Sequence, residues 1–258
     1  MSVLYELTDG VARVTIDRPN RMNAVDQPTE LELDRIWSEI ECDPEVRCVV
    51  LTGAGERAFC AGADLKAGSG KSGLEYWAEM NPNGFGGIAM RPSMNVPVIA
   101  RVNGLALGGG MEMVLGCDII IAADDARFGL PEAKVGRVPL EGGMILLQRL
   151  IPEKIAAGIM LTGRMLPAQM AAEYGLVNAV VPREDLDAEV DNWVRDIVAC
   201  APLSLTAIKQ TIRQTKHLSV SDGFGLKVPE LIAALNSEDA EEGVAAFQEK
   251  RAPVWRGK

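Results

Sequence analysis

The first residue with chemical potential is Glu112, which follows the glycine run Gly108-Gly109-Gly110 and Met111. The apolar stretch after these glycines predicts a helix that begins here. Backbone N–H groups at a helix start favour negative charge, and glycines let a ligand approach the backbone closely. Glu112 therefore either complements the dipole of its own helix or exchanges protons in an apolar setting, where an unpartnered carboxylate is costly.

A second carboxylate, Glu132, closes the segment Phe128-Gly-Leu-Pro-Glu132. Pro131 disfavours a helix interior at this point, so Glu132 is expected in a loop or at a helix start. A second junction that contains glycine is Phe59-Cys-Ala-Gly-Ala-Asp-Leu-Lys66. Two carboxylates and two such junctions predict an acid/base pair that faces an oxyanion hole.

Other kinds of catalytic site have weaker support. His217 is the only histidine, which excludes sites with several histidine ligands, and its position beside Lys216 is typical of a helix end. No pair among the five cysteines has metal-ligand or redox spacing, although Cys60 lies beside the second junction. Gly53-Ala-Gly-Glu-Arg-Ala58 fits a dinucleotide fingerprint, but a helix signal does not follow it. We expect no metal and no separate cofactor.

Composition describes a globular protein with an acidic surface. The chain has 258 residues, 48% of them hydrophobic and 24% charged, with a net charge of −10. One large domain, or one domain with a small appendage, fits this length. The acidic balance disfavours a nucleic-acid partner. We find no long apolar run and no secretory signal, and the odd number of cysteines suits free thiols, so we expect a cytoplasmic protein without a membrane partner.

Strand and helix signals alternate over the first part of the chain and predict an α/β fold. Apolar runs indicate strands at Leu4–Leu7, Val11–Ile16, Val46–Thr52, Val96–Val102 and Ile119–Ala122. Asp26 is expected to cap a helix that buries Leu33, Ile36, Trp37 and Ile40. Residues 67–92 are rich in glycine and predict a loop, with one helical turn around Leu74–Met80.

After about residue 143 the pattern becomes helical. Helices are expected at Gly143–Leu150, Glu153–Leu161, Pro167–Tyr174, Glu184–Cys200, Leu203–Thr215, Ser221–Asn236 and Glu238–Lys250, with one short strand at Asn178–Val181. We divide the chain into a core, residues 1–196, which carries the two carboxylates and the glycine junctions, and a helical region, residues 197–258, which is expected to serve oligomerisation.

Taken in order, these segments resemble those of the crotonase family, the enoyl-CoA hydratase/isomerase superfamily. The resemblance covers nearly the whole chain. It is carried by Ile16-Asp-Arg-Pro-Asn-Arg-Met-Asn-Ala24, Leu51-Thr-Gly-Ala-Gly55, Ala58-Phe-Cys-Ala-Gly-Ala-Asp-Leu-Lys66, Val102-Asn-Gly-Leu-Ala-Leu-Gly-Gly-Gly-Met-Glu112, Cys117-Asp118, Ala126-Arg-Phe-Gly-Leu-Pro-Glu132, Leu161-Thr-Gly163 and Ala172-Glu-Tyr-Gly-Leu-Val-Asn178.

The resemblance implies a fold and a set of roles. The fold is a crotonase-like spiral of ββα turns with a helical C-terminal region, assembled as a homotrimer or a dimer of trimers. The backbone N–H groups of Ala63 and Gly109 form the oxyanion hole, while Glu112 and Glu132 hold and activate a water. Coenzyme A enters as part of the substrate, and the residues implied to bind CoA or substrate are Arg21, Met22, Ala24, Ala61, Asp64, Leu65, Lys66, Gly108, Pro131 and Glu141.

One departure from many simple hydratases is Leu140-Glu141, where small residues are usual. Glu141 is expected either to line the acyl pocket as a third carboxylate or to cap the helix that follows. The segments Phe128–Lys134, Ser237–Gly243 and Glu249–Gly257 are similar to the carnitinyl-CoA dehydratase branch. The expected activity is that of an enoyl-CoA hydratase. The alternatives are a carnitinyl-CoA dehydratase-like enzyme, a Δ3,Δ2-enoyl-CoA isomerase, and a non-catalytic acyl-CoA- or RNA-binding member.

Overall fold

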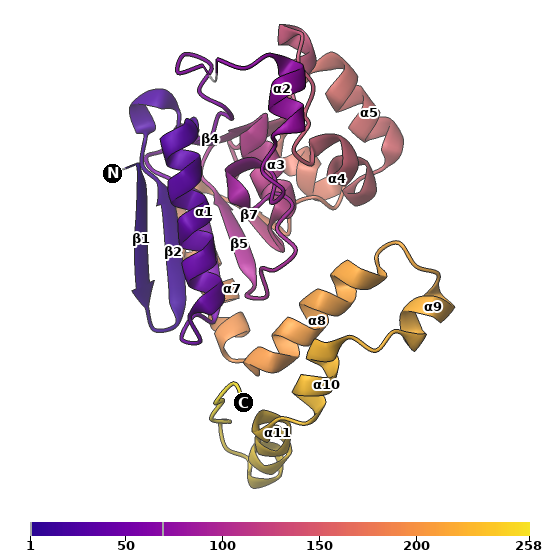
Figure 1. Cartoon of the computed structure of the whole chain (residues 1–258). Helices are drawn as coiled ribbons and strands as arrows, with labels where there is room; N and C mark the ends of the chain where they lie inside the picture. Colours follow the sequence, from indigo (N-terminus) through magenta and orange to yellow (C-terminus); the bar gives the residue numbers. More distant parts are fainter. Residues whose placement is uncertain (1, 69) are drawn as a thin grey trace.

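The computed structural model describes residues 2–68 and 70–258 and has a layered α/β core with a helical C-terminal region (Figure 1). Within these residues, a six-stranded sheet has the order β1-β2-β3-β5-β7-β10. Its strands are β1 (Val3–Thr8), β2 (Val11–Ile16), β3 (Cys48–Gly53), β5 (Val98–Val102), β7 (Ile119–Ala123) and β10 (Ala179–Val181). The antiparallel hairpin β1–β2 lies at one edge, and the remaining neighbours are parallel. The strands expected from the apolar runs are confirmed.

A second, smaller sheet was not expected from the hydropathy pattern. It consists of β4 (Ala58–Cys60), β6 (Leu105–Leu107), β8 (Arg127–Gly129) and β9 (Leu166–Pro167), in that order. Each of these strands has only two or three residues, too few to show a period of two. The chain passes from β3 to β4, from β5 to β6 and from β7 to β8, entering one sheet and then the other before the next helix. This is the spiral of ββα turns, and the α/β fold class is confirmed.

Helix α1 (Gln27–Cys42) shows how the sequence specifies its own local structure. The Asp26 carboxylate accepts a hydrogen bond from Thr29 N at 3.1 Å and so caps the helix. Apolar residues at helical spacing form its inner face, and Leu33, Ile36, Trp37 and Ile40 are buried. Burial of this face fixes α1 beside the larger sheet (Figure 1).

The segment 67–92 is only partly the loop that its glycines predict. The expected helical turn is present as α2 (Gly73–Ala78), which a capping box at Ser72 and Glu75 begins. Beyond it, the 3₁₀ turn Phe85–Gly87 is buried, and the indole of Trp37 donates to Gly86 O at 2.7 Å. Residues 85–89 therefore belong to the core, and the expectation of one continuous loop is wrong for them.

The other core helices are α3 (Gly109–Gly116), α4 (Gly143–Leu150), α5 (Glu153–Thr162), α6 (Ala168–Glu173) and α7 (Leu186–Val198). They are followed by α8 (Pro202–Thr215), α9 (Val220–Gly225), α10 (Pro229–Leu235) and α11 (Glu238–Glu249), which extend away from the sheets (Figure 1). The single helix expected at Ser221–Asn236 is wrong. Pro229 begins a new helix there, because the residue before a proline disfavours helical backbone. The division between residues 196 and 197 falls inside α7 and stays a prediction.

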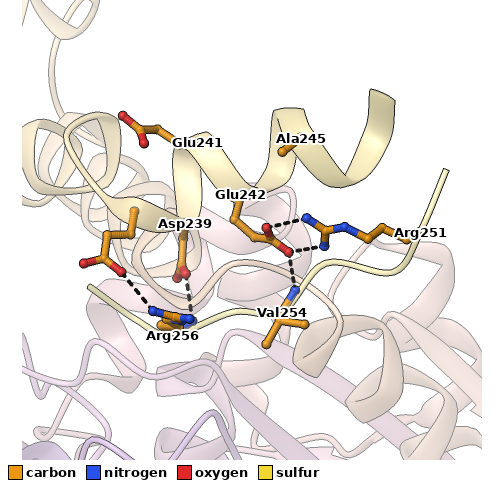
Figure 2. Close-up of a pocket in the computed structure, with 8 residues that line it drawn as sticks. Asp239, Glu241, Glu242, Ala245, Arg251, Val254 and Arg256 are labelled. Carbon is orange, nitrogen blue, oxygen red and sulfur yellow. Dashed lines mark hydrogen bonds and ion pairs between the residues drawn. The ribbon is translucent and has the colours of Figure 1, made fainter. Parts of the chain in front are cut away.

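The C-terminal tail folds back on α11 through buried and charged contacts (Figure 2). The buried Asp239 carboxylate accepts hydrogen bonds from the backbone N–H groups of Arg256 and Gly257, at 2.7 and 2.8 Å. Glu242 pairs with the Arg251 guanidinium and accepts from Val254 N at 2.7 Å. These contacts account for the polar lining of a hollow of about 650 Å³ at this end. In the part of the chain that is described, no helix combines the length and apolarity needed to cross a membrane.

Candidate active site

Glu112 lies in the first turn of α3, and its carboxylate serves a different helix. The side chain is 3% exposed, and Oε1 accepts hydrogen bonds from the backbone N–H groups of Glu141 and Gly143, both at 2.9 Å. Gly143 is the first residue of α4, so the carboxylate occupies the positive end of α4. The dipole of its own helix α3 therefore does not explain the position of the Glu112 carboxylate, because both N–H groups that it binds lie at the start of α4.

Glu132 lies near the start of α3, although it belongs to a later segment of the chain. It begins the 3₁₀ turn Glu132–Val135 directly after Pro131, as expected from the proline. Its Oε2 is buried and has no hydrogen-bond partner among the described residues. Its Oε1 lies 3.3 Å from the point that a Cβ at Gly108 would occupy. Glu132 thus faces the glycine run that precedes α3.

Glu132 acts electrostatically on the carboxyl group of Glu112. Burial and, to a smaller extent, the nearby Glu132 raise the pKa of Glu112 to about 7, against the lowering effect of its hydrogen bonds. Burial also raises the pKa of Glu132 above its usual range. Two neighbouring acids with raised pKa values are suited to general acid–base chemistry.

The junctions around Ala63 and Gly109 meet beside Glu132. A Cβ at Gly62 would lie 3.1 Å from Gly109 N and 2.9 Å from Leu107 O, so only glycine permits this approach. Val25 N donates to Gly62 O, and Asp64 N donates to Val25 O, which leaves the Ala63 N–H directed away from that bridge. The Gly109 N–H belongs to the first turn of α3, where amides have no partner within the helix. The Gly62–Ala63 segment and the start of α3 therefore lie side by side.

Helix α3 packs tightly against this junction and holds it in position. A Cβ at Gly110 would lie 2.0 Å from Cys60 O, and one at Gly109 would lie 2.5 Å from the ring of Phe85. Cys60 itself is fully buried, and burial raises the pKa of its thiol to about 12. Cys60 stays a neutral thiol at neutral pH, so its role beside the site is packing and not nucleophilic attack.

Two segments, Arg18–Ala24 and Ala61–Lys66, are expected to hold coenzyme A, and the Arg18 side chain joins them. Its guanidinium pairs with Asp26 at 2.7 Å and with Asp64 at 3.1 Å, and it also donates to Ala24 O. Ala61 N donates to Met22 O at 3.0 Å, so the two expected CoA-binding segments lie side by side. The Asp64 side chain is engaged by Arg18, whereas Arg21, Leu65 and Lys66 are exposed. Arg18 was implied by the motif, and its joining role becomes visible only in the fold.

Glu141 does not cap α4, contrary to one of its two expected roles. The N-cap of α4 is Gly142, without a side-chain cap, whereas the Glu141 carboxyl accepts a hydrogen bond from the Tyr76 hydroxyl. Glu141 is 4% exposed, and burial raises its pKa to about 8. Sequence reasoning missed Tyr76, because it lies in the glycine-rich segment and 65 residues from its partner. Its capping box, Ser72 with Glu75, was the available signal for a helix here.

Nothing in the described residues gathers three or more His, Cys, Asp or Glu side chains in a way that could bind a metal ion. A hollow of about 510 Å³ lies between α2 and the loop before α4, and its wall includes Leu74, Trp77, Val138 and Leu140. Tyr76, whose hydroxyl donates to the Glu141 carboxyl, also lines this hollow.

Several known proteins are similar to this chain over nearly its whole length. The carnitinyl-CoA dehydratase of Citrobacter koseri is 39% identical over 252 residues, which are 96% of this chain and 95% of that protein. The protein of the same name from Salmonella arizonae is 40% identical over 251 residues, with the same coverage. An enoyl-CoA hydratase structure from Mycobacterium tuberculosis has a TM-score of 0.91 at 36% identity and covers 100% of this chain and 99% of that one.

A second solved structure, of an enoyl-CoA hydratase from Bacillus anthracis, has a TM-score of 0.92 at 33% identity over 100% of both chains. The sequence model of the family described as enoyl-CoA hydratase/isomerase matches residues 6–258. These matches span the spiral core and the C-terminal helices alike. The resemblance seen in the motifs is confirmed, and the chain belongs to the enoyl-CoA hydratase/isomerase family.

Proposed function

We propose that this protein is an enoyl-CoA hydratase that adds water reversibly to a 2-enoyl-CoA thioester. The observation that carries the proposal is the pairing of the buried Glu112 and the half-buried Glu132, two acids with raised pKa values, beside the Gly62–Gly109 junction. Hydration needs a base toward water, an acid toward carbon and a site for an oxyanion. This arrangement offers a candidate group for each requirement.

In the proposed reaction, Glu112 and Glu132 hold one water between them. Glu112 accepts a proton as the water oxygen attacks C3 of the conjugated thioester, and the double bond shifts electrons to the thioester oxygen. The N–H groups of Ala63 and Gly109 donate hydrogen bonds to that developing oxyanion. Glu132 then delivers a proton to C2, which restores the thioester. Dehydration follows the same path in reverse.

The proposed coenzyme A site consists of the segments that Arg18 joins. The adenine lies near Met22 and Ala24, the thioester arm passes Ala61 and Leu65, and Gly108 and Pro131 border the acyl end. Arg21 and Lys66 are exposed cations next to these segments, which suits contacts with phosphates. A local cationic pair of this kind explains how an acidic protein would bind an anionic ligand.

The names of the relatives favour a second candidate within the same chemistry. Several proteins 38–40% identical to this chain are named carnitinyl-CoA dehydratase. A dehydratase runs the proposed reaction toward the alkene, so both candidates use the same two glutamates. Initial rates with carnitinyl-CoA and with 3-hydroxybutyryl-CoA would separate them, because a dedicated carnitinyl-CoA enzyme turns over the first much faster.

We also propose that the chain forms a homotrimer or a dimer of trimers in the cytoplasm. Large apolar side chains are exposed on the C-terminal helices, among them Ile212 at 63%, Phe224 at 94% and Phe247 at 86%. Apolar surface of this kind is typical of an interface with another copy. The cysteines are all free, which suits a reducing compartment. Light scattering on the purified protein would test for three or six times the chain mass of 27.7 kDa.

The decisive experiment follows the absorbance of the conjugated thioester after purified protein is mixed with crotonyl-CoA. The proposal expects rapid loss with the native protein and little loss with Glu132→Gln. The matched control is Glu173→Gln, an exposed glutamate on α6. No loss with crotonyl-CoA or carnitinyl-CoA, together with movement of a double bond in 3-enoyl-CoA, would replace the hydratase by an isomerase. Tight RNA binding without any turnover would indicate a non-catalytic member.

A further inference from the structure

The carboxyl group of Glu141 is only half satisfied by hydrogen bonds inside the protein. Oε1 accepts a hydrogen bond from the Tyr76 hydroxyl, whereas Oε2 is buried and lacks a hydrogen-bond partner among the described residues. The side chain is 4% exposed, so bulk water does not replace the missing partner. A buried polar atom without a partner destabilises the folded protein, unless a ligand supplies the hydrogen bond.

This carboxyl group lies next to the proposed acid/base pair but has its own hydrogen-bond partner and its own charged neighbour. Its backbone N–H holds Glu112, which fixes Glu141 next to the reacting groups. The charge that acts on the Glu141 carboxyl comes from Glu30 in α1, whereas the charge that acts on Glu112 comes from Glu132. Glu141, Glu30 and Tyr76 therefore form a polar corner between α1, α2 and the loop before α4.

The corner is rich in acceptors. Asp34 raises the pKa of Glu30, and Glu30 in turn raises the pKa of Glu141. The Tyr76 hydroxyl already donates its hydrogen bond to Glu141. Lys71 lowers the pKa of Glu30, and it pairs with Glu79 at 2.6 Å. The unpartnered oxygen of the ionised carboxyl group thus calls for a donor from outside the chain, and in the protonated acid it can in turn donate to a ligand hydroxyl. A hollow of about 510 Å³, lined by Tyr76 and by Leu140, the residue before Glu141, gives room nearby for an acyl chain that carries such a group.

We propose that Glu141, positioned by Tyr76, selects acyl groups that carry a hydrogen-bond donor, a hydroxyl or an amino group, beyond the reacting carbons. This inference rests on the proposed function and adds a substrate class to it. Glu141 is a specificity-determining residue here and takes no part in the proton transfers of Glu112 and Glu132. Tyr76 acts through Glu141 as a positioning residue.

The test compares matched 2-enoyl-CoA pairs of four to eight carbons, with and without a terminal hydroxyl, and an amino series of the same lengths. For at least one length, kcat/KM is expected to be about tenfold higher for the thioester that carries the donor. That ratio is expected to fall toward one in Glu141→Met, which has a similar length and no oxygen, and to decrease in Tyr76→Phe. The control variants are Glu173→Gln on α6 and Tyr5→Phe on β1, which are expected to keep the native ratio.

The pH dependence distinguishes the two sources of the donor. An ammonium group binds the ionised carboxylate, so its KM should fall as pH rises through about 8, where Glu141 ionises. The KM for a hydroxyl-bearing substrate should not show this fall. A ratio near one at every length in the native protein, or an unchanged ratio in Glu141→Met, overturns the inference. Absence of turnover with the plain thioesters as well would instead overturn the proposed hydratase function.

Discussion

The Oε1 atom of Glu112 lies 2.9 Å from the backbone N of Gly143, so a carboxylate of α3 occupies the N-terminus of α4. A second hydrogen bond from Glu141 N fixes the same oxygen. With Oε1 held in this way, the orientation of the carboxyl group is set before any ligand arrives. Rigid placement of a proton-transfer group is what general acid–base catalysis requires.

Replacement of Glu112 by glutamine is expected to lower kcat for crotonyl-CoA hydration about 10³-fold, the range typical of a lost general base. The amide oxygen can still accept from Glu141 N and Gly143 N, so the fold should persist. Stopped-flow absorbance would measure the rate, and circular dichroism would check the fold. Hydration at the native rate would remove Glu112 from the mechanism, and Glu173→Gln serves as the control.

The acid limb of the pH–rate profile should report Glu112. Its pKa is raised to about 7, and a base acts only when ionised, so kcat/KM for hydration should fall tenfold per pH unit below about 7. Measurement from about pH 5 to about pH 9 would show the limb. A limb near the ordinary glutamate value would contradict the assignment of Glu112 as the base.

Alanine at Gly108 is expected to lower kcat about tenfold or more, because a Cβ there would lie 3.3 Å from Glu132 Oε1 beside the oxyanion donors. Gly108 has a φ of +55°, so backbone strain will also lower the melting temperature. Gly175→Ala is the matched control, since its φ is +80° and its surroundings are open. If both variants lose stability alike and keep full activity, the contact between Gly108 and Glu132 has no catalytic meaning.

Glu141 should shape the dependence of stability on pH. The pKa of Glu141 is about 8 in the folded protein, above the ordinary glutamate value. Its favourable contribution to the free energy of unfolding is therefore complete below that ordinary value and is lost as pH rises toward 8. Glu141→Gln removes the titration and should reduce this loss between about pH 4.5 and pH 8, by an amount on the order of 5 kcal/mol. Denaturant titrations at several pH values would measure it. Parallel curves for the two proteins would contradict the assignment.

Assembly through the C-terminal helices gives a further prediction. Phe224→Glu and Phe247→Glu place a charge at side chains that are 94% and 86% exposed in the single chain. If these side chains are covered in an oligomer, each variant should shift the mass toward the monomer. Sedimentation equilibrium would measure the shift, with Leu161→Glu on α5, 80% exposed, as the control outside the C-terminal helices. Native mass in both phenylalanine variants would exclude them from the interface.

The amino-acid sequence by itself determined the elements that are long enough to show a period. The α1 face with Leu33, Ile36, Trp37 and Ile40 and the strands of the larger sheet follow from local pattern and burial. It also indicated Glu112, Glu132 and the glycine junctions, because charge in an apolar segment and glycine at a turn are local signals. The motif order was sufficient to indicate the family.

Tertiary structure alone decided the relationships between distant residues. The strands of the smaller sheet, with two or three residues each, form through pairing, and Glu112 serves α4 because the spiral brings that helix to its carboxylate. The contact between Tyr76 and Glu141 joins residues 65 positions apart, at a separation that no local period reaches. Burial, and with it the raised pKa of each acid, depends on which segments the whole fold packs together, and this is why the chemistry of the site became visible only in three dimensions.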